Sequence, residues 1–150
     1  MTAQQFLHHY FAALLTIYVV SFWLIVCALS SRFGGWYALA RVFRTQFPFE
    51  GSKWRFQSGQ MRGFINYGNC LTVGASREGV YLAVLPLLRF MHPPLLVPWS
   101  EIKVQRSKIW VFEYVRFIMG REAAVPLRIR GALAAKLRAA AGNSWPIEET

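Results

Sequence analysis

The chain begins with one unbroken apolar stretch and continues as short runs in which apolar and polar residues alternate. Residues 10–29 carry no charge, and eleven of them are Phe, Leu, Ile or Val. About 20 apolar residues form a helix long enough to cross the hydrocarbon core of a bilayer. Insertion of these side chains near the bilayer centre is favourable by roughly 3–6 kcal/mol. The pattern predicts one transmembrane helix at residues 10–30, preceded by a short extracytoplasmic segment at residues 1–9.

Two alternatives to a transmembrane helix exist for this stretch, a cleaved signal peptide and a buried globular helix. A signal peptide has a basic first region and a shorter apolar region, whereas here no Lys or Arg precedes position 32. The tripeptide at residues 28–30, Ala-Leu-Ser, resembles a cleavage site and leaves this alternative open. A buried globular helix is disfavoured because the run is apolar on every face.

A second helical pattern follows Gly34-Gly35, which interrupt the first helix. At 100° per residue, residues 36–47 place aromatic and aliphatic side chains on one face and basic or polar ones on the other. The apolar face contains Trp36, Leu39, Ala40, Phe43 and Phe47, and the polar face contains Arg41, Arg44 and Thr45. This segregation is typical of a helix lying in the membrane interface, and it also fits a helix packed on its own domain. We favour the interfacial helix, within residues 31–48, because it starts where the transmembrane helix ends.

The remaining chain has the pattern of short strands separated by turns. The predicted strands are residues 53–57, 64–67, 70–73, 80–85, 95–97, 103–107, 111–117 and 125–129, with turns at residues 68–69, 76–79 and 120–122. Strands at this spacing indicate an antiparallel barrel or sandwich. The nearly continuous apolar run 80–85 predicts a strand covered on both faces, and the alternation at 102–106 predicts one wet face.

One amphipathic helix is predicted after the strands. Ile129, Leu133, Leu137 and Ala140 share a face, and Gly142-Asn143 is a stop signal. Residues 143–150, which include Glu148 and Glu149, are expected to be a frayed tail. The helix would then close one open end of the barrel.

A proline-rich stretch, HPPLLVPWSEI at residues 92–102, follows the strand that begins GVYL at residues 79–82. Proline cannot donate to a strand ladder, so Pro98 is expected on an edge strand or at a bulge. With the order of strands closed by one helix, these two motifs resemble bacterial pleckstrin-homology-like (PH-like) and GRAM-like domains over residues 50–142.

The resemblance implies an α+β fold at residues 49–142: an antiparallel β-barrel or sandwich of about seven strands, closed by a C-terminal helix. It also implies a surface that binds membrane lipids or proteins. Lipid-binding members often carry basic residues around the loop between their first two strands. Here Lys53, Arg55 and Arg62 flank a predicted turn at residues 58–60.

Charge adds an orientation to this picture. The chain has 17 Lys and Arg against 7 Asp and Glu, a net charge of +10, and all of them lie at position 32 or later. Because Arg32, Arg41 and Arg44 follow the apolar stretch, the positive-inside rule predicts a cytoplasmic body on a single-pass membrane protein. The resemblance to bacterial domains implies that this membrane is the bacterial inner membrane. The two cysteines, Cys27 and Cys70, do not suggest a disulfide-stapled fold.

The sequence contains no motif that indicates chemistry. It has no nucleophile elbow, P-loop, zinc-protease motif or dinucleotide fingerprint, so we expect no catalytic, cofactor or metal site and no small-molecule substrate. His92 is interpreted as a loop residue, and Cys70 as a small buried one. Nucleic-acid binding is disfavoured, because the basic residues alternate through the strands and a membrane helix precedes them.

Two functions therefore stand as hypotheses. In the first, the chain is an accessory subunit of a larger integral membrane complex, of respiratory or photosynthetic type for example, and its body docks on that complex. Exposed aromatic and basic residues are favoured at such contacts, and the candidates are Trp23, Trp99, Lys108 and Trp110. In the second, the body binds anionic lipid head groups, and the candidate contacts are Arg32, Trp36, Arg41, Arg44, Lys53, Arg55 and Arg62.

Overall fold

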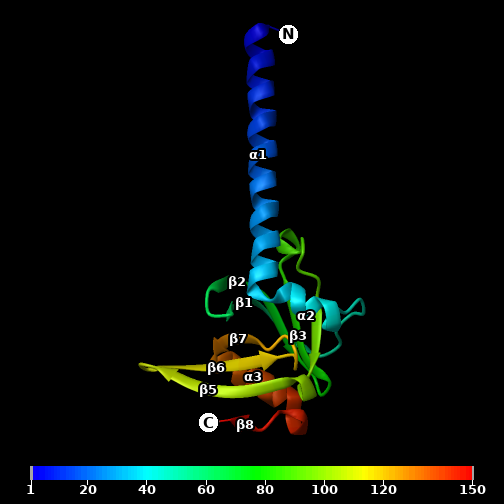
Figure 1. Ribbon diagram of the computed structural model, residues 1–150, viewed down its shortest axis with the longest axis vertical. Coiled ribbons are helices and arrows are strands. Elements are labelled where there is room, and N and C mark those ends of the chain that lie inside the picture. Colours follow the sequence, from blue (N-terminus) through cyan, green and yellow to red (C-terminus); the bar gives the residue numbers. More distant parts are fainter. Residues whose placement is uncertain (1, 150) are drawn as a thin grey trace.

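The computed structural model describes residues 2–149, and it shows a long helix standing on a β-sheet body (Figure 1). Helix α1 (Ala3–Gly34) has 32 residues, about 48 Å at 1.5 Å per residue. It is long and apolar enough to span a membrane, which confirms the predicted apolar helix and extends it at both ends. Most of its side chains are exposed, and only Cys27, Ser31 and Gly34, near its end, are buried.

The body consists of two further helices and eight strands in one mixed sheet. The helices are α2 (Trp36–Phe43) and α3 (Gly131–Ala141). The strands are β1 (Ser52–Met61), β2 (Ile65–Ala75), β3 (Gly79–Val84), β4 (Leu95–Pro98), β5 (Ile102–Ile109), β6 (Phe112–Met119), β7 (Val125–Arg130) and β8 (Glu148–Glu149).

The strands are ordered β4-β3-β2-β1-β7-β6-β5-β8, antiparallel except for the parallel pair β5–β8. The sheet curls into a half-barrel, and α3 packs on strands from both halves of it, β2 and β6. Leu133 and Leu137 of α3 enter the same core as the sheet, as predicted. β5 alternates buried and exposed residues at its start, and Pro98 lies on the edge strand β4, also as predicted.

The predicted turns at residues 58–60 and 68–69 are wrong, because these residues lie inside strands β1 and β2. Asn69 has a positive φ of 52° within β2, and its backbone N–H donates to the hydroxyl oxygen of Ser58 at 2.9 Å. The register shifts around Gln57 show that β1 is irregular opposite this point. Gly59 serves close packing instead of a turn, since a Cβ there would lie 2.9 Å from Leu71 Cδ1 and 3.0 Å from Leu127 Cδ1.

Helix α2 packs on the body of its own chain, which corrects the expected interfacial helix. Trp36 and Leu39 are 0% exposed within the core, so the membrane contact expected for Trp36 is wrong. The helix ends at Phe43, and Phe47 lies beyond it, exposed. Gly35 makes the sharp turn from α1 into α2 at φ 90°, where a Cβ would meet Val125 at 2.7 Å.

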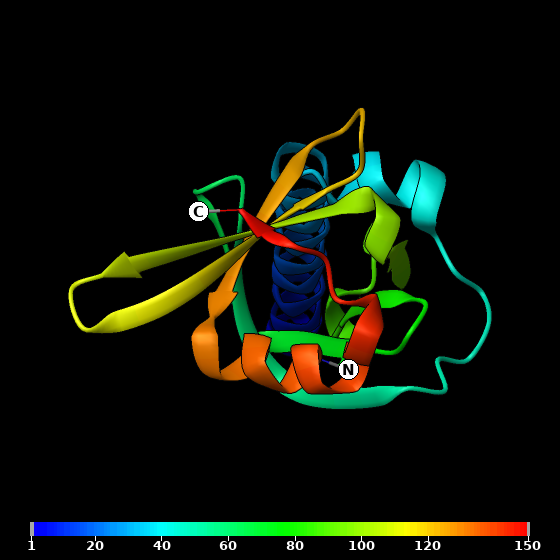
Figure 2. The ribbon, with the colours of Figure 1, turned by 90° about the horizontal axis from the view of Figure 1, so that it is seen from below.

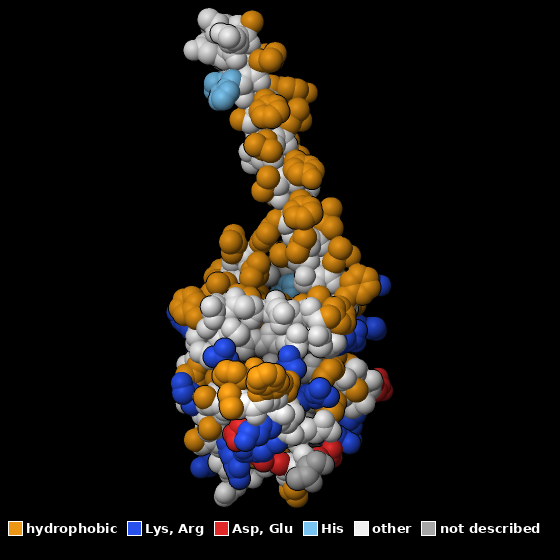
Figure 3. Space-filling model, turned by 90° about the vertical axis from the view of Figure 1, so that its left-hand side faces the viewer, with side chains coloured by type: hydrophobic (Ala, Val, Ile, Leu, Met, Phe, Trp, Pro, Cys, Tyr) orange, Lys and Arg blue, Asp and Glu red, His pale blue; other side chains and the backbone are white. Residues whose placement is uncertain are grey.

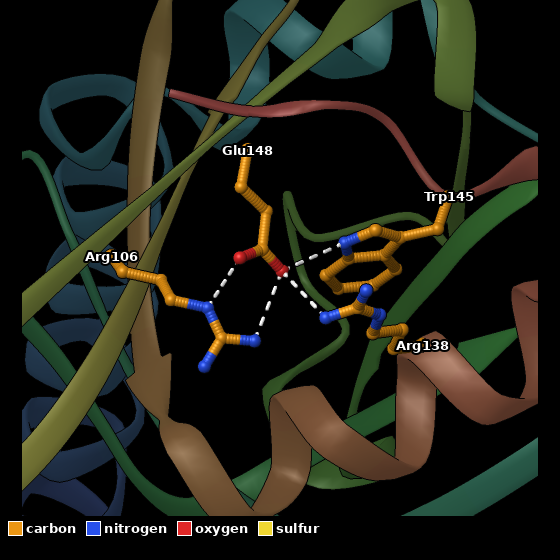
Figure 4. Close-up of polar contacts among 4 residues, drawn as sticks. All are labelled: Arg106, Arg138, Trp145 and Glu148. Carbon is orange, nitrogen blue, oxygen red and sulfur yellow. Dashed lines mark hydrogen bonds and ion pairs between the residues drawn. The ribbon is translucent and has the colours of Figure 1, made fainter. Parts of the chain in front are cut away.

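The C-terminal segment is also ordered, which corrects the expected frayed tail. β8 pairs with β5, and Figure 4 shows the Glu148 carboxylate among three donors. It accepts hydrogen bonds from Arg106 on β5, from Arg138 Nη1 at 3.3 Å and from Trp145 Nε1 at 3.1 Å. Hydrogen bonding from Arg106 holds the pKa of the Glu148 carboxyl below its ordinary value. Met1 and Thr150, part of the predicted end segments, lie outside the described residues.

Trp99 is a packing residue, which corrects its expected role as a partner contact. Its side chain is 6% exposed, and its Nε1–H donates to the carbonyl of Ser76 at 2.7 Å. Its ring lies 5.2 Å from Trp145 and 6.5 Å from Phe117, centroid to centroid. This aromatic cluster joins the β4–β5 crossover to the C-terminal segment.

We expect Trp99→Ala to lower the free energy of unfolding of the body by about 3–5 kcal/mol, because it leaves a large cavity. Trp99→Phe keeps most of the packing and loses the bond to Ser76, a smaller cost of about 1 kcal/mol. Denaturant unfolding in detergent, followed by tryptophan fluorescence, measures both. Equal stability of Trp99→Ala and the parent would contradict the packing role.

Candidate functional site

The most distinctive surface feature is the β5–β6 hairpin, whose outer half projects from the sheet. β6 pairs with β7 only from Tyr114 onward, and β8 reaches β5 only at Val104 and Gln105. Within the described part of the chain, residues 106–113 of the hairpin therefore pair only with each other. The hairpin extends sideways from the body, across the direction of α1 (Figures 1 and 2).

The hairpin tip consists of four exposed apolar residues in sequence. Ile109, Trp110, Val111 and Phe112 are 45%, 90%, 80% and 59% exposed. An isolated two-stranded ribbon is marginally stable in water, and an exposed apolar edge promotes association. The composition of the tip therefore indicates a contact surface.

Trp110 has an unfavourable backbone conformation for its residue type. Its φ is 59°, and it is the first residue of a two-residue hairpin turn, a position at which glycine is preferred when φ is positive. A bulky residue in such a conformation costs on the order of 1–3 kcal/mol. Trp110 therefore lowers the stability of the turn while it exposes the largest apolar side chain available.

Basic side chains surround the apolar tip. Figure 3, which views the molecule from the side on which the hairpin projects, shows a central apolar cluster bordered by Lys and Arg. Arg106, Lys108 and Arg116 are exposed along the hairpin, and Glu113 lies opposite Lys108 in the register. The tip is thus an apolar centre with a mostly positive rim. The bond from Arg106 to Glu148 fixes the base of the hairpin to the C-terminal segment.

The second distinctive surface is the end of the body next to α1. The segment at residues 85–94, between β3 and β4, lies beside the last part of α1 (Figure 1), and the hydroxyl of Ser31 donates to the carbonyl of Met91. Leu87, Phe90 and Met91 are exposed there. In Figure 3 the apolar surface of α1 continues onto this end of the body.

A buried polar cluster holds this segment in place. His92 is 2% exposed, its Nδ1 lies 3.0 Å from the carbonyl of Phe90, and its Nε2 lies 3.0 Å from the hydroxyl of Tyr67. A carbonyl only accepts, so Nδ1 carries the proton and Nε2 accepts from Tyr67. The indole of Trp36 lies 5.3 Å from the His92 ring, centroid to centroid, with the planes tilted by 59°, and it donates to the carbonyl of Pro93 at 2.9 Å. His92 is therefore a loop residue, as predicted, and its side chain is buried and hydrogen-bonded within the body.

The candidate lipid contacts divide into two groups. Arg32, Arg41, Arg44 and Arg62 are exposed at the α1 end of the body, where Arg62 Nη1 donates to the carbonyl of Phe33 at 3.2 Å. Lys53 and Arg55 belong to the opposite end of β1, because β1 meets the β2 hairpin at Met61–Ile65 and Ile65 contacts Gly34 of α1. Lys53 and Arg55 therefore do not belong to the basic patch that was expected next to the membrane helix.

The candidate partner contacts also lie in different parts of the structure. Lys108 and Trp110 lie together on the hairpin, whereas Trp99 is in the core and Trp23 is half-buried on α1. Sequence reasoning missed the exposed segment at residues 85–91 and the role of Glu148. The apolar sequence LPLLRFM between two predicted strands could have indicated the exposed segment. The role of Glu148 had no such signal, because it is one carboxylate in a polar C-terminal segment.

Among residues 2–149, no three His, Cys, Asp or Glu side chains gather closely enough to hold a metal ion. A hollow of about 550 Å³ lies between residues 45–51 and the turn at residues 76–78, and its walls include Phe47, Glu50 and Arg77. Comparison with known proteins found no match: no family model, no curated protein and no solved structure is similar to this chain. The two exposed surfaces are consequently the basis for a functional proposal.

His92 predicts a pH dependence of stability. Burial lowers the pKa of His92 in the folded state below its ordinary value of about 6.5, so the unfolded state binds more protons below that pH. Stability is then complete above about pH 6.5 and decreases as the pH falls through this value. Thermal unfolding at pH 7.5 and pH 5.5 should show a lower Tm at the acidic pH.

His92→Asn should flatten this pH dependence, because Asn keeps an N–H for the carbonyl of Phe90 and does not titrate. Tyr67→Phe is the control: it removes one hydrogen bond, costs about 1 kcal/mol at both pH values, and leaves the titrating group in place. An unchanged pH dependence in His92→Asn would show that another group is responsible.

Proposed function

We propose that this chain is a non-enzymatic, single-pass membrane protein whose body docks on a larger integral membrane complex as an accessory subunit. α1 crosses the inner membrane once, with the body on the cytoplasmic side as the arginines after α1 predict. The hairpin tip is the docking element. The observation that carries the proposal is Trp110, 90% exposed at the end of a projecting hairpin.

The composition of the tip supports contact with protein. Trp is enriched at binding hot spots, where an exposed aromatic side chain enters a pocket of the partner. Lys108 beside the tip, and Arg116 further along the hairpin, are exposed basic residues, and they favour a partner whose pocket is bordered by acidic side chains. The expected partner surface is thus an apolar pocket with acidic residues around it.

The direction of the hairpin supports a partner in the same membrane. With α1 across the bilayer, a hairpin that projects sideways from the axis of α1 extends along the membrane surface (Figures 1 and 2). It therefore reaches toward the cytoplasmic face of a neighbouring membrane protein. The contacts of Cys27 and Ser31 with the body also favour a retained helix over a cleaved signal peptide. We also propose that the body is related to PH-like domains, whose known roles include docking on other proteins.

The test is Trp110→Gly in the full-length chain, purified in mild detergent with its bound proteins identified by mass spectrometry. Glycine adopts the positive φ without strain, so we expect stability to stay equal or rise by about 1 kcal/mol. Copurification of the integral membrane partner is expected to be lost. A folded variant that keeps the partner would contradict docking through the tip.

Phe56→Gly is the matched control. Phe56 also has a positive φ, 55°, and is 63% exposed, but it lies on β1 away from the hairpin. The same relief of strain at this position should leave copurification unchanged. Loss of the partner in both variants would point to a general effect of glycine instead of a role for Trp110.

A second function, binding of anionic lipid, is favoured by the arginines that gather at the α1 end. Arg32, Arg41, Arg44 and Arg62 are exposed there, where a basic residue near an anionic surface contributes about 1 kcal/mol. This function is compatible with docking, because the lipid would orient a body that the hairpin attaches to a partner.

We expect the double variant Arg41→Gln/Arg44→Gln to bind phosphatidylglycerol roughly thirtyfold more weakly, at about 1 kcal/mol per arginine. Lipid retained after detergent exchange, measured at low and high salt, reports the change. Lys103→Gln/Lys136→Gln removes the same charge elsewhere on the body and should bind as the parent does. Equal binding by both double variants would contradict a lipid site at the α1 end.

A further inference from the structure

We infer that residues 85–91 form a membrane-inserted loop, which enters the bilayer leaflet on the body's side of the membrane and contacts lipid acyl chains beside α1. The inference rests on the part of the proposed function in which α1 spans the membrane. It adds a second point at which the body enters the bilayer, and it identifies the lipid hydrocarbon as what covers this surface.

The position of the loop relative to α1 is the first argument. Cys27 and Ser31 lie on one face of α1 and are buried there, and Ser31 donates to the carbonyl of Met91. The apolar run 10–29 that would occupy the hydrocarbon includes position 27. Ser31, the α1 residue bonded to the loop, lies two residues beyond this run, so the loop lies at the hydrocarbon boundary.

The outward side chains of the loop are the second argument. Leu87 is 74% exposed, Phe90 45% and Met91 39%, although each is large and apolar. The end of α1 to which Ser31 and Met91 bond this loop also has exposed apolar side chains, those of Leu29 and Phe33. A patch that is continuous with a membrane helix has the bilayer as its nearest apolar environment, whereas in water it would be an unprotected hydrophobic surface.

The backbone of the loop is the third argument. Peptide groups enter hydrocarbon only when they are hydrogen-bonded internally. Here the 3-10 helix η1 (Pro86–Leu88) pairs the amides of Leu88 and Arg89 with the carbonyls of Leu85 and Pro86. Nearby carbonyls accept from the body: Arg89 from the His92 amide, Phe90 from the His92 ring, Met91 from Ser31, Pro93 from Trp36 and Pro94 from Thr45.

Arg89 limits the depth of insertion. It is exposed in the middle of the loop, and a guanidinium in a shallow position can extend to the phosphate groups while its methylene stem stays among apolar groups. Leu87 and Phe90 would then occupy the outer acyl region with Arg89 at the head groups. This pattern is that of an interfacial element and not of a second membrane crossing.

The test uses the full-length chain in phosphatidylcholine vesicles, with single cysteines labelled by an environment-sensitive fluorophore in a Cys27→Ala/Cys70→Ala background. Leu87→Cys and Phe90→Cys probe the loop, Val19→Cys probes the middle of α1, and Arg77→Cys probes the opposite end of the sheet. We expect spin-labelled lipid to quench the probes at 87, 90 and 19. Aqueous iodide should quench the probe at 77 several-fold more strongly than the other three.

Two outcomes would overturn the inference and are distinguishable. If iodide quenches positions 87 and 90 as strongly as position 77 while position 19 stays protected, α1 spans the membrane and the loop does not enter it. If position 19 is also accessible to iodide, the membrane span itself is wrong, and the proposed function is wrong with it.

A second measurement needs no substitution. A hydrophobic diazirine dissolved in the bilayer labels residues that contact acyl chains, and mass spectrometry of the unmodified protein locates the label. We expect label in α1 and in residues 85–91, and none in the turn at residues 76–79. Label confined to α1 would overturn the inference even if the cysteine-free background failed to fold.

Discussion

The packing of Trp36 beneath the end of α1 is the contact on which the arrangement of the other elements depends. Gly35 turns the chain through a positive φ, and the indole then becomes completely buried against Tyr67 and His92. Burial of about 200 Å² of a Trp side chain contributes roughly 5 kcal/mol before its entropy cost. A flexible link between α1 and the body would not bury the Trp36 side chain in this way. The direction of α1 and the orientation of the sheet are therefore fixed together.

This rigid junction gives each exposed surface a definite place relative to the membrane that α1 is proposed to cross. The 85–91 segment lies against α1 because His92 and Ser31 hold its carbonyl groups. The hairpin, at a different height on the body, extends across the helix axis (Figure 1). In the proposed arrangement one apolar surface faces the bilayer and the other faces along it, so the two do not compete for the same environment.

The hairpin illustrates how local stability is given up at a proposed contact. Trp110 occupies a turn position suited to glycine, and its neighbours are apolar where water would favour polar residues. The base of the hairpin is correspondingly reinforced, because Glu148 joins β5 to α3 through Arg106 and Arg138 (Figure 4). The strained and exposed part of the hairpin is confined to its tip.

The amino-acid sequence alone determined the apolar helix, the β-rich body, the closing helix α3 and the edge position of Pro98. These features depend on local properties: an uncharged run, period-two alternation, a stop signal and the missing amide of proline. Tertiary structure decided what each apolar face contacts. The periodicity of α2 fits a membrane surface and a protein core equally well, and only the three-dimensional packing placed Trp36 in the core. The same holds for Trp99 and Trp110, which are alike in sequence terms: one is buried at a crossover and the other is exposed on a hairpin, because burial depends on residues far away in the chain.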